Sequence, residues 1–378
     1  MPPLTFLTTV WHATFDNEFN FNAQTWGFFN RDTWQVLLLV VFILVLSRSM
    51  KEAGALEQLV GSVRRVFGDN RFTIGALPAM IGLLPVPGGA LISAPMIEGL
   101  ADEAELTPED RTYLNYWFRH VWEYSYPLYP GLILSAVIIN VDLATLIHYQ
   151  FPLSLAAILG GSLFGLLGIK KHFRKRLNGG EFWTQIMEFL KGFWPVLVIF
   201  VALLGFNLPF VLVLLFIVLL FGFTRLGPGK FLKTAKEAFN LKIIGTIYAV
   251  LVFKDIINAS GAVDQLAAVF QSWGVPPIIL FILLPMVIGY LNGITHAYVS
   301  VAFPLLLPFF LDPQGNVDLS KVQLAYAFGF IGVIFSPVHL CLILSAKYYN
   351  ADLNGVFRKL ILPSVVLAIT SLLFYFFS

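Results

Sequence analysis

Residues 84–95 read LPVPGGALISAP and interrupt an apolar stretch, residues 72–100, in which Glu98 is the single charged residue. Proline lacks the amide hydrogen that a helix requires, and glycine weakens a helix through its backbone entropy, so this sequence predicts a break between two short helices. Unwound backbone is tolerated inside a membrane only where it faces protein or a water-filled cavity. The stretch therefore predicts a helical hairpin whose tip meets a polar environment.

The composition is that of a polytopic membrane protein. Of the 378 residues, 58% are hydrophobic and 12% are charged, and the mean hydropathy is +0.79. A water-soluble domain of this length would not tolerate such a surface. The net charge of +2 does not suggest nucleic acid as a partner, and the single cysteine, Cys341, excludes an internal disulfide and argues against a cysteine metal site. We expect a protein of the cytoplasmic (inner) membrane, with the lipid bilayer as its surroundings.

Two kinds of apolar stretch are present. A full crossing needs about 20 apolar residues, and eight stretches meet this requirement: 32–52, 111–141, 146–169, 187–206, 208–224, 242–259, 321–347 and 360–377. Residues 72–100 and 278–310 instead provide two arms each, and an arm of about 13 residues reaches only about 20 Å into a core of about 30 Å. These two stretches predict re-entrant helical hairpins.

The basic residues orient this arrangement. With eight crossings and two hairpins, the four clusters that begin at Arg64, Lys170, Arg225 and Arg358 all fall on one side of the membrane. The positive-inside rule makes that side cytoplasmic. Both chain termini are then predicted outside, and residues 1–31 are predicted to lie at the membrane interface as an aromatic, acidic segment without a cleavable signal peptide.

An internal repeat supports the same scheme. AGALEQL at 53–59 resembles SGAVDQL at 260–266, and LILSA occurs at both 132–136 and 342–346. The counted crossings make the two copies inverted, as in many secondary transporters. The predicted parts are an interfacial segment (1–31), repeat 1 (32–169, with hairpin 72–100 and broken helix 111–141), basic loops with two central linking helices (170–241), and repeat 2 (242–378, with hairpin 278–310 and broken helix 321–347).

The predicted fold is therefore an all-α polytopic membrane protein of two inverted-topology repeats, each with a re-entrant hairpin and a discontinuous transmembrane helix. The repeat places PVPGG, 85–89, opposite NGITH, 292–296. Breaks are also expected at YPLYPG, 126–131, and FSPVH, 335–339, because both contain proline. All four breaks are predicted to meet near the centre of the membrane.

The chemistry expected there is anion binding. Helices that restart after a break point their N-termini at the membrane centre, which favours an anion. Freed carbonyl groups suit a sodium ion, for which the candidate positions are Pro85, Gly88, Asn292 and Thr295. The full set of candidate substrate-binding residues is Pro87, Gly88, Gly89, Arg119, His120, Glu123, Asn292, Gly293, Thr295, His296, Ser336 and His339.

The polar cluster FRHVWEYSYP, 118–127, contributes most to this prediction, because ionisable residues within a membrane usually mark a functional site. Arg119 is expected to attract the anion, and Glu123 or His120 to take up a coupling proton. In the structural alternative, Arg119 and Glu123 neutralise each other at helical i,i+4 spacing, and His339 is a packing residue. Lys254 and Asp255 are expected to belong to the scaffold.

The expected function is secondary active transport of a small carboxylate-type anion by alternating access, coupled to Na⁺ or H⁺. No cofactor is expected, and no metalloprotease, α/β-hydrolase or phosphate-loop motif indicates an enzyme. Two alternatives remain open. The first is an intramembrane enzyme that acts on a lipid-linked anion, which would need serine, histidine and aspartate around a cavity open to lipid. The second is a passive anion channel.

Three stretches are similar to an integral-membrane family known as the domain of unknown function 401. They are LSRSMKEAGALEQL at 46–59, GLLPVPGGALISAPMIE at 82–98 and YLNYWFRHVWEYSYPLYPGLIL at 113–134. That family is placed near the gluconate permeases, within the wider ion transporter superfamily. The resemblance implies inverted repeats with two hairpins, a homodimer, and an elevator-like movement coupled to Na⁺ or H⁺. It implies no substrate.

Overall fold

The computed structural model describes residues 31–66, 70–83, 89–170, 179–206, 208–259, 265, 269, 270, 272 and 274–378. Its described part is built from helices, with one isolated β-bridge between Leu311 and Val317. Residues 1–30 of the predicted interfacial segment, and Pro85, Pro87 and Gly88 of the first hairpin tip, lie outside the described residues.

Among the described residues, four helices are long and apolar enough to cross a membrane: α2 (Arg31–Glu52), α8 (Leu143–Gly161) with its π-helical extension to Leu166, α9 (Gly179–Phe200) with its extension to Gly205, and α18 (Leu353–Phe377). Shorter apolar helices are α10 (Phe210–Arg225), α14 (Pro277–Asn292), α15 (Thr295–Phe310), α16 (Leu319–Ile334) and α17 (Leu340–Tyr349). Large apolar side chains such as Leu212, Phe216 and Phe376 face outward, each more than 60% exposed. An apolar surface of this kind is suited to lipid, so the structure is that of a membrane protein.

Each stretch that was predicted as a hairpin forms two helices with an interruption between them. In the first, α4 (Asn70–Gly82) and α5 (Ala90–Glu103) pack against each other. In the second, α14 and α15 do the same, and Gly293 between them takes the left-handed conformation, with φ of +63°. Glycine adopts this conformation without steric cost, so the sequence NGITH ends one helix and starts the next.

Both predicted discontinuous helices are interrupted. The first is divided into α6 (Pro108–Arg119) and α7 (Pro130–Ile138), and the second into α16 and α17. The first interruption begins at His120, earlier than the prediction at 126–131. Residues 120–129 form turns instead of helix, and the hydroxyl of Tyr326 donates a 2.9 Å hydrogen bond to the carbonyl of Glu123 within them. This contact from α16 stabilises a carbonyl group that no longer has a helical partner.

Each hairpin contacts the broken helix of its own half of the chain and also that of the other half. Helix α5 contacts α17, which lies in the second half of the chain, whereas α15 contacts α7, which lies in the first half. Within each half, α4 packs against α6 and α14 packs against α16. The polar breaks of both halves are therefore brought together in one region of the molecule.

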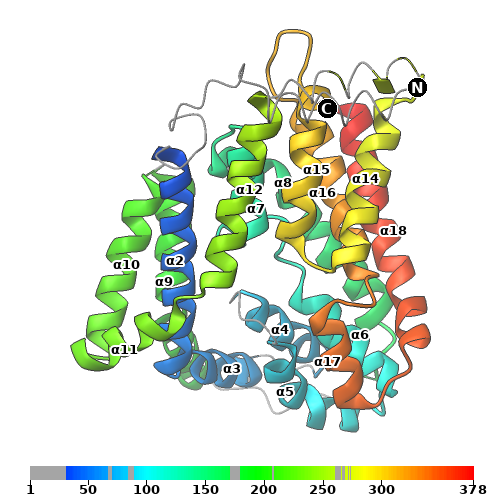
Figure 1. Cartoon of the computed structure of the whole chain (residues 1–378). Helices are drawn as coiled ribbons and strands as arrows, with labels where there is room; N and C mark the ends of the chain where they lie inside the picture. The colour runs from blue at the N-terminus through cyan, green and yellow to red at the C-terminus, as the bar shows by residue number, and fades with distance from the viewer. Residues whose placement is uncertain are drawn as a thin grey trace.

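Helices α2, α9 and α10 form a second group, in which α10 contacts both α2 and α9. Figure 1 shows α2, α9 and α10 on one side of the molecule and α14, α16 and α18 on the other. Two further helices, α3 (Ala55–Val66) and α11 (Pro228–Ala238), were not predicted, because they are too short and too polar to be recognised as spans. They lie at the end of the molecule opposite the C-terminus (Figure 1). Helix α12 (Leu241–Ala259) contacts both α2 and α15.

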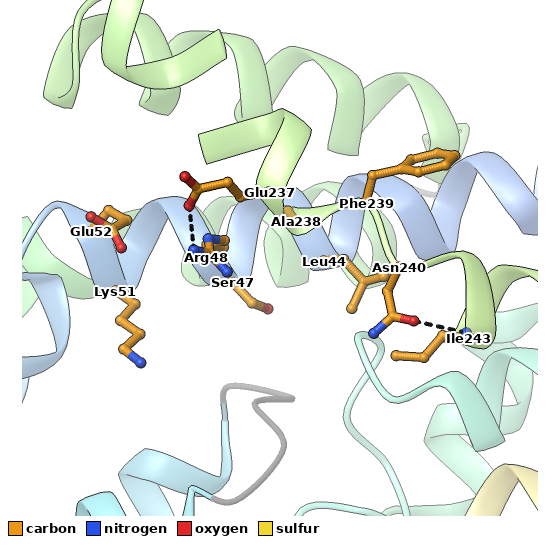
Figure 2. Close-up of a pocket in the computed structure, with 10 residues that line it drawn as sticks. All are labelled: Leu44, Ser47, Arg48, Lys51, Glu52, Glu237, Ala238, Phe239, Asn240 and Ile243. Atoms are coloured by element: carbon orange, nitrogen blue, oxygen red, sulfur yellow. Dashed lines mark hydrogen bonds and ion pairs between the residues drawn. The ribbon is translucent and has the colours of Figure 1, made fainter. Parts of the chain in front are cut away.

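Charged side chains join α2 to α11 beside a cavity of about 280 Å³. The guanidinium group of Arg48 donates to the carboxylate of Glu237, and Oδ1 of Asn240 accepts a hydrogen bond from the backbone amide of Ile243, 3.1 Å away, at the start of α12 (Figure 2). The cavity is lined by Leu44, Ser47, Arg48, Lys51, Glu52, Glu237, Ala238, Phe239, Asn240 and Ile243. Its ionic groups are solvent-accessible, and such pairs contribute little to stability.

Candidate functional site

The centre of the candidate site is Arg119, the last residue of α6. Its side chain is only 5% exposed. Nη1 donates to Sγ of Cys341, 3.2 Å away on α17, and lies 3.3 Å from Nε2 of His120. The guanidinium group lies directly against Gly89, which immediately precedes α5: a Cβ atom on Gly89 would be 2.6 Å from Nη2 of Arg119. A residue larger than glycine would displace the arginine, so the first hairpin and α6 meet at this charge.

Glu123 lies in the turns that follow α6 and connects the first half of the chain to the second. Its side chain is buried, and Oε2 accepts a 2.7 Å hydrogen bond from the hydroxyl of Thr295, the first residue of α15. Its other oxygen, Oε1, is 3.9 Å from Nε2 of His120. The carboxylate therefore lies at the N-terminus of α15, where the helix dipole stabilises a negative charge.

The i,i+4 spacing proposed for Arg119 and Glu123 does not describe their relation. That spacing requires a continuous helix, whereas α6 ends at Arg119 and residues 120–125 form turns. A separation of four residues along the chain therefore does not by itself bring these two side chains into contact. Glu123 is instead directed toward Thr295 and His120.

His120 and His339 face each other across the two halves of the molecule. Their Nε2 atoms are 3.2 Å apart, and the ring centroids are 5.0 Å apart. Nδ1 of His120 is 2.6 Å from the carbonyl oxygen of Tyr116, and Nδ1 of His339 is 2.7 Å from that of Gly293. Both side chains are buried. His339 therefore makes a specific contact with the cluster, which packing alone does not require.

Tyrosine side chains bind the freed carbonyl groups of both breaks. Tyr116 on α6 donates a 3.1 Å hydrogen bond to the carbonyl of Ile334, at the end of α16. Tyr326 on α16 donates in the opposite direction, to the carbonyl of Glu123. Each break is thus stabilised by a hydroxyl group from the other half of the chain.

The other predicted residues have different positions. The hydroxyl of Ser336 donates to the carbonyl of Tyr290, 2.6 Å away, and lies close to Gly293. His296 is half-buried on α15. Asn292 is exposed, and its amide donates to the carbonyl of Ile288 in its own helix. Asn292 and Thr295 are the predicted sodium ligands that the structure describes. Each is hydrogen-bonded to a different residue, Asn292 to Ile288 and Thr295 to Glu123.

Two residues that contribute to the cluster were not predicted as binding residues. Cys341 was considered only for disulfide and metal chemistry, yet its sulfur accepts from Arg119, and donor atoms of His120, His339 and Cys341 lie within 4.8 Å of one another. The second contributor is Tyr116, which is not among the predicted binding residues. The repeat provided a signal for it, because Tyr116 corresponds to Tyr326 at the 210-residue offset that relates the two LILSA motifs.

Comparison with known proteins identifies the family. A search of curated proteins found no match. A family model described as a protein of unknown function, DUF401, matches residues 25–377, which is nearly the whole chain and includes every helix described above. The chain therefore belongs to the DUF401 family.

Proposed function

We propose that this protein is a secondary active transporter that moves a small carboxylate-type anion across the cytoplasmic membrane by alternating access. The observation that carries the proposal is the position of Arg119. Its buried guanidinium group lies against Gly89, at the N-terminal end of α5. A helix N-terminus carries partial positive charge, so two positive groups point at one place in the protein interior. An anion bound between them would be attracted by both.

Correspondence between the two halves supports inverted repeats. Asn140 and Asn350, separated by 210 residues, both adopt the left-handed conformation, with φ of +54° and +55°. Each is followed two residues later by an aspartate, Asp142 or Asp352, that caps the next helix through its side chain. Paired local structures at a constant offset are typical of duplicated transporter folds.

Close helix contacts show the same correspondence. A Cβ atom on Gly82 would lie 2.1 Å from the carbonyl oxygen of Arg119, and one on Gly289 would lie 2.2 Å from that of Gly329. Gly82 and Gly289 are separated by 207 residues, and Arg119 and Gly329 by 210, which are the two offsets of the sequence repeat. Both hairpins therefore meet the adjacent broken helix in the same way, which supports two re-entrant hairpins with related roles.

The proposed transporter has eight crossings, both termini outside, and an elevator-like movement of the hairpins and broken helices relative to the group of α2, α9 and α10. A homodimer, coupling to Na⁺ or H⁺, and a place in the ion transporter superfamily near the gluconate permeases are further parts of the proposal. These parts rest on the sequence resemblance and on the positive-inside rule.

The topology gives a direct prediction. In a protein whose own Cys341 is replaced by alanine, a cysteine introduced at exposed Lys230 should react with a membrane-impermeant maleimide only from the cytoplasmic side. A cysteine at exposed Gln314 should react only from the outside. Inside-out and right-side-out vesicles allow both measurements. Reaction of both positions from the same side would rule out the proposed orientation of the two halves.

The proposed anion site can be tested by a thermal-shift screen of the purified protein. The panel contains formate, lactate, gluconate, succinate, phosphate and sulfate, with glycerol and choline as neutral and cationic controls, at pH 5.5 and 7.5 and with or without Na⁺. A ligand that binds the native state stabilises it as the logarithm of its concentration over its Kd. We expect one carboxylate to raise the melting temperature well beyond the other salts. Stabilisation by the neutral or cationic controls alone would contradict the proposal.

A further inference from the structure

The hydrogen-bond pattern around His120 and His339 determines where their hydrogens lie. A backbone carbonyl oxygen accepts hydrogen bonds and cannot donate. Nδ1 of His120 faces the carbonyl of Tyr116 and Nδ1 of His339 faces that of Gly293, so both Nδ1 atoms carry a hydrogen. Neutral imidazole has one N–H group, which leaves a lone pair on each Nε2. These two lone pairs are directed at each other across 3.2 Å.

Two facing lone pairs do not form a hydrogen bond. Arg119 donates to Nε2 of His120 from 3.3 Å, but within the described part of the chain the atom at hydrogen-bond distance from Nε2 of His339 is Nε2 of His120, with Sγ of Cys341 in the same cluster. A buried acceptor without a donor is costly. One additional hydrogen placed between the two Nε2 atoms would convert this contact into a charge-assisted hydrogen bond.

We propose that the histidine pair, His120 and His339, is the coupling site, and that it binds one proton between its two Nε2 atoms together with the transported anion. This inference rests on the proposed transport function. It identifies H⁺ as the coupling ion. The two histidines together bind one proton. The proton comes from the aqueous phase on one side of the membrane and returns to water on the other.

The surrounding charges explain why the proton and the anion would bind together. The titratable groups that face the pair are Arg119 and Tyr116 on α6, Glu123 in the following turns, and Cys341 on α17; Phe330 on α16 is apolar. Arg119 and Glu123 together carry no net charge when both are ionised, so an added proton leaves the cluster with one positive charge. A bound monoanion neutralises that charge. By linkage, each ligand then raises the affinity for the other by the same factor.

The same geometry disfavours a metal ion between the histidines. Two Nε2 atoms with a nearby thiol form a donor set that suits zinc. However, Nη1 of Arg119 lies 3.3 Å from Nε2 of His120 and 3.2 Å from Sγ of Cys341, so a full positive charge already contacts two of the three donors. A divalent cation would be repelled at this distance, whereas a single proton adds the smallest charge.

Solid-state nitrogen NMR of the full-length protein in lipid, labelled with ¹⁵N-histidine, tests the proposal with protons as the only probe. Nitrogen shifts distinguish a nitrogen that carries a hydrogen from one that does not. At high pH, we expect Nε2 of both histidines to be unprotonated and Nδ1 of both to be protonated. As the pH falls, both Nε2 signals should move in one common step that corresponds to one proton.

Two variants and an internal reference assign these signals. His120→Gln and His339→Gln each remove one set of resonances and should abolish the common step. His148 on α8, whose Nδ1 lies 2.8 Å from the carbonyl of Ala144, serves as a histidine outside the pair. The wild-type spectrum alone decides the outcome if either variant fails to fold. Two independent one-proton steps, an Nε2 atom that is protonated at every pH, or one equivalent of bound zinc in the purified protein would each overturn the proposal.

A binding experiment distinguishes the coupling site from the transport proposal. Its ligand is the anion that stabilises the protein most in the thermal-shift screen. The affinity for that anion should fall about tenfold per pH unit above the midpoint of the step, and His339→Gln should remove this dependence. Anion binding that does not change with pH would leave the transport proposal intact but overturn the coupling site. A common proton step without binding of any anion would leave the pair intact but contradict transport.

Discussion

Replacing Arg119 by glutamine is expected to lower the affinity for the transported anion by about 100-fold or more. Arginine contributes a permanent charge and a planar group of donors, and hydrogen bonds to charged groups are worth about 1.5–3 kcal/mol each. Loss of two such bonds corresponds to at least about 3 kcal/mol, or more than a hundredfold in Kd. Isothermal titration with the carboxylate that stabilises the wild-type protein measures this change.

Two controls separate a loss of binding from a loss of structure. Arg111→Gln removes another arginine of α6, one that is paired with Asp102 on the surface, and should leave the affinity unchanged. The double variant Arg119→Gln with Glu123→Gln removes both buried charges. If Arg119 serves only to balance Glu123, the double variant should recover both stability and anion binding. Recovery of stability without recovery of binding is the result expected for a binding residue.

The second large effect is expected at the two glycines where helices touch. Gly82→Ala and Gly289→Ala should each destabilise the protein by about 3 kcal/mol or more. The added methyl group would lie 2.1 Å from the carbonyl oxygen of Arg119 in the first case and 2.2 Å from that of Gly329 in the second. Overpacking costs about 1–3 kcal/mol and more where the obstacle is rigid, and here the obstacle is helix backbone. Thermal unfolding in detergent measures the effect.

Gly99→Ala is the matched control for both substitutions. Gly99 lies in α5 with nothing within 4 Å of an added Cβ atom. Alanine is favoured over glycine in a helix by about 0.5–1 kcal/mol, so this change should leave stability equal or slightly increased. Equal effects at Gly82 and Gly289 would support the same role for both hairpins. A tolerated alanine at either position would contradict the close contact on which that correspondence rests.

The helix boundaries were largely predictable because they depend on local sequence. Spans follow from the length of apolar stretches, and the break before Thr295 follows from Asn292-Gly293, where glycine permits the left-handed conformation. The early end of α6 was not predictable in this way. Residues 118–125 contain neither proline nor glycine, and the turns depend on hydrogen bonds from distant residues, such as that from Tyr326 to the carbonyl of Glu123.

The residues of the candidate site were easier to predict than the contacts between them. Arg119, His120 and Glu123 were predicted because they are ionisable residues within a predicted span, and charges are rare inside membranes. The partner of each depends on how the two halves pack. The repeat does not pair the two histidines, because at the 210-residue offset His120 corresponds to Phe330 and His339 to Tyr129. Their contact therefore required the three-dimensional structure.

Counterflow in proteoliposomes distinguishes a carrier from a channel and from an enzyme. Vesicles that contain the purified protein are loaded with a high concentration of the unlabelled carboxylate found in the thermal-shift screen, and are diluted into a trace of the same labelled anion. A carrier exchanges one molecule for another, so we expect labelled anion to accumulate transiently above its equilibrium level in wild-type vesicles and not in Arg119→Gln vesicles. A monotonic approach to equilibrium without saturation would indicate a channel, and chemical conversion of the anion would indicate an enzyme; either result would rule out secondary active transport.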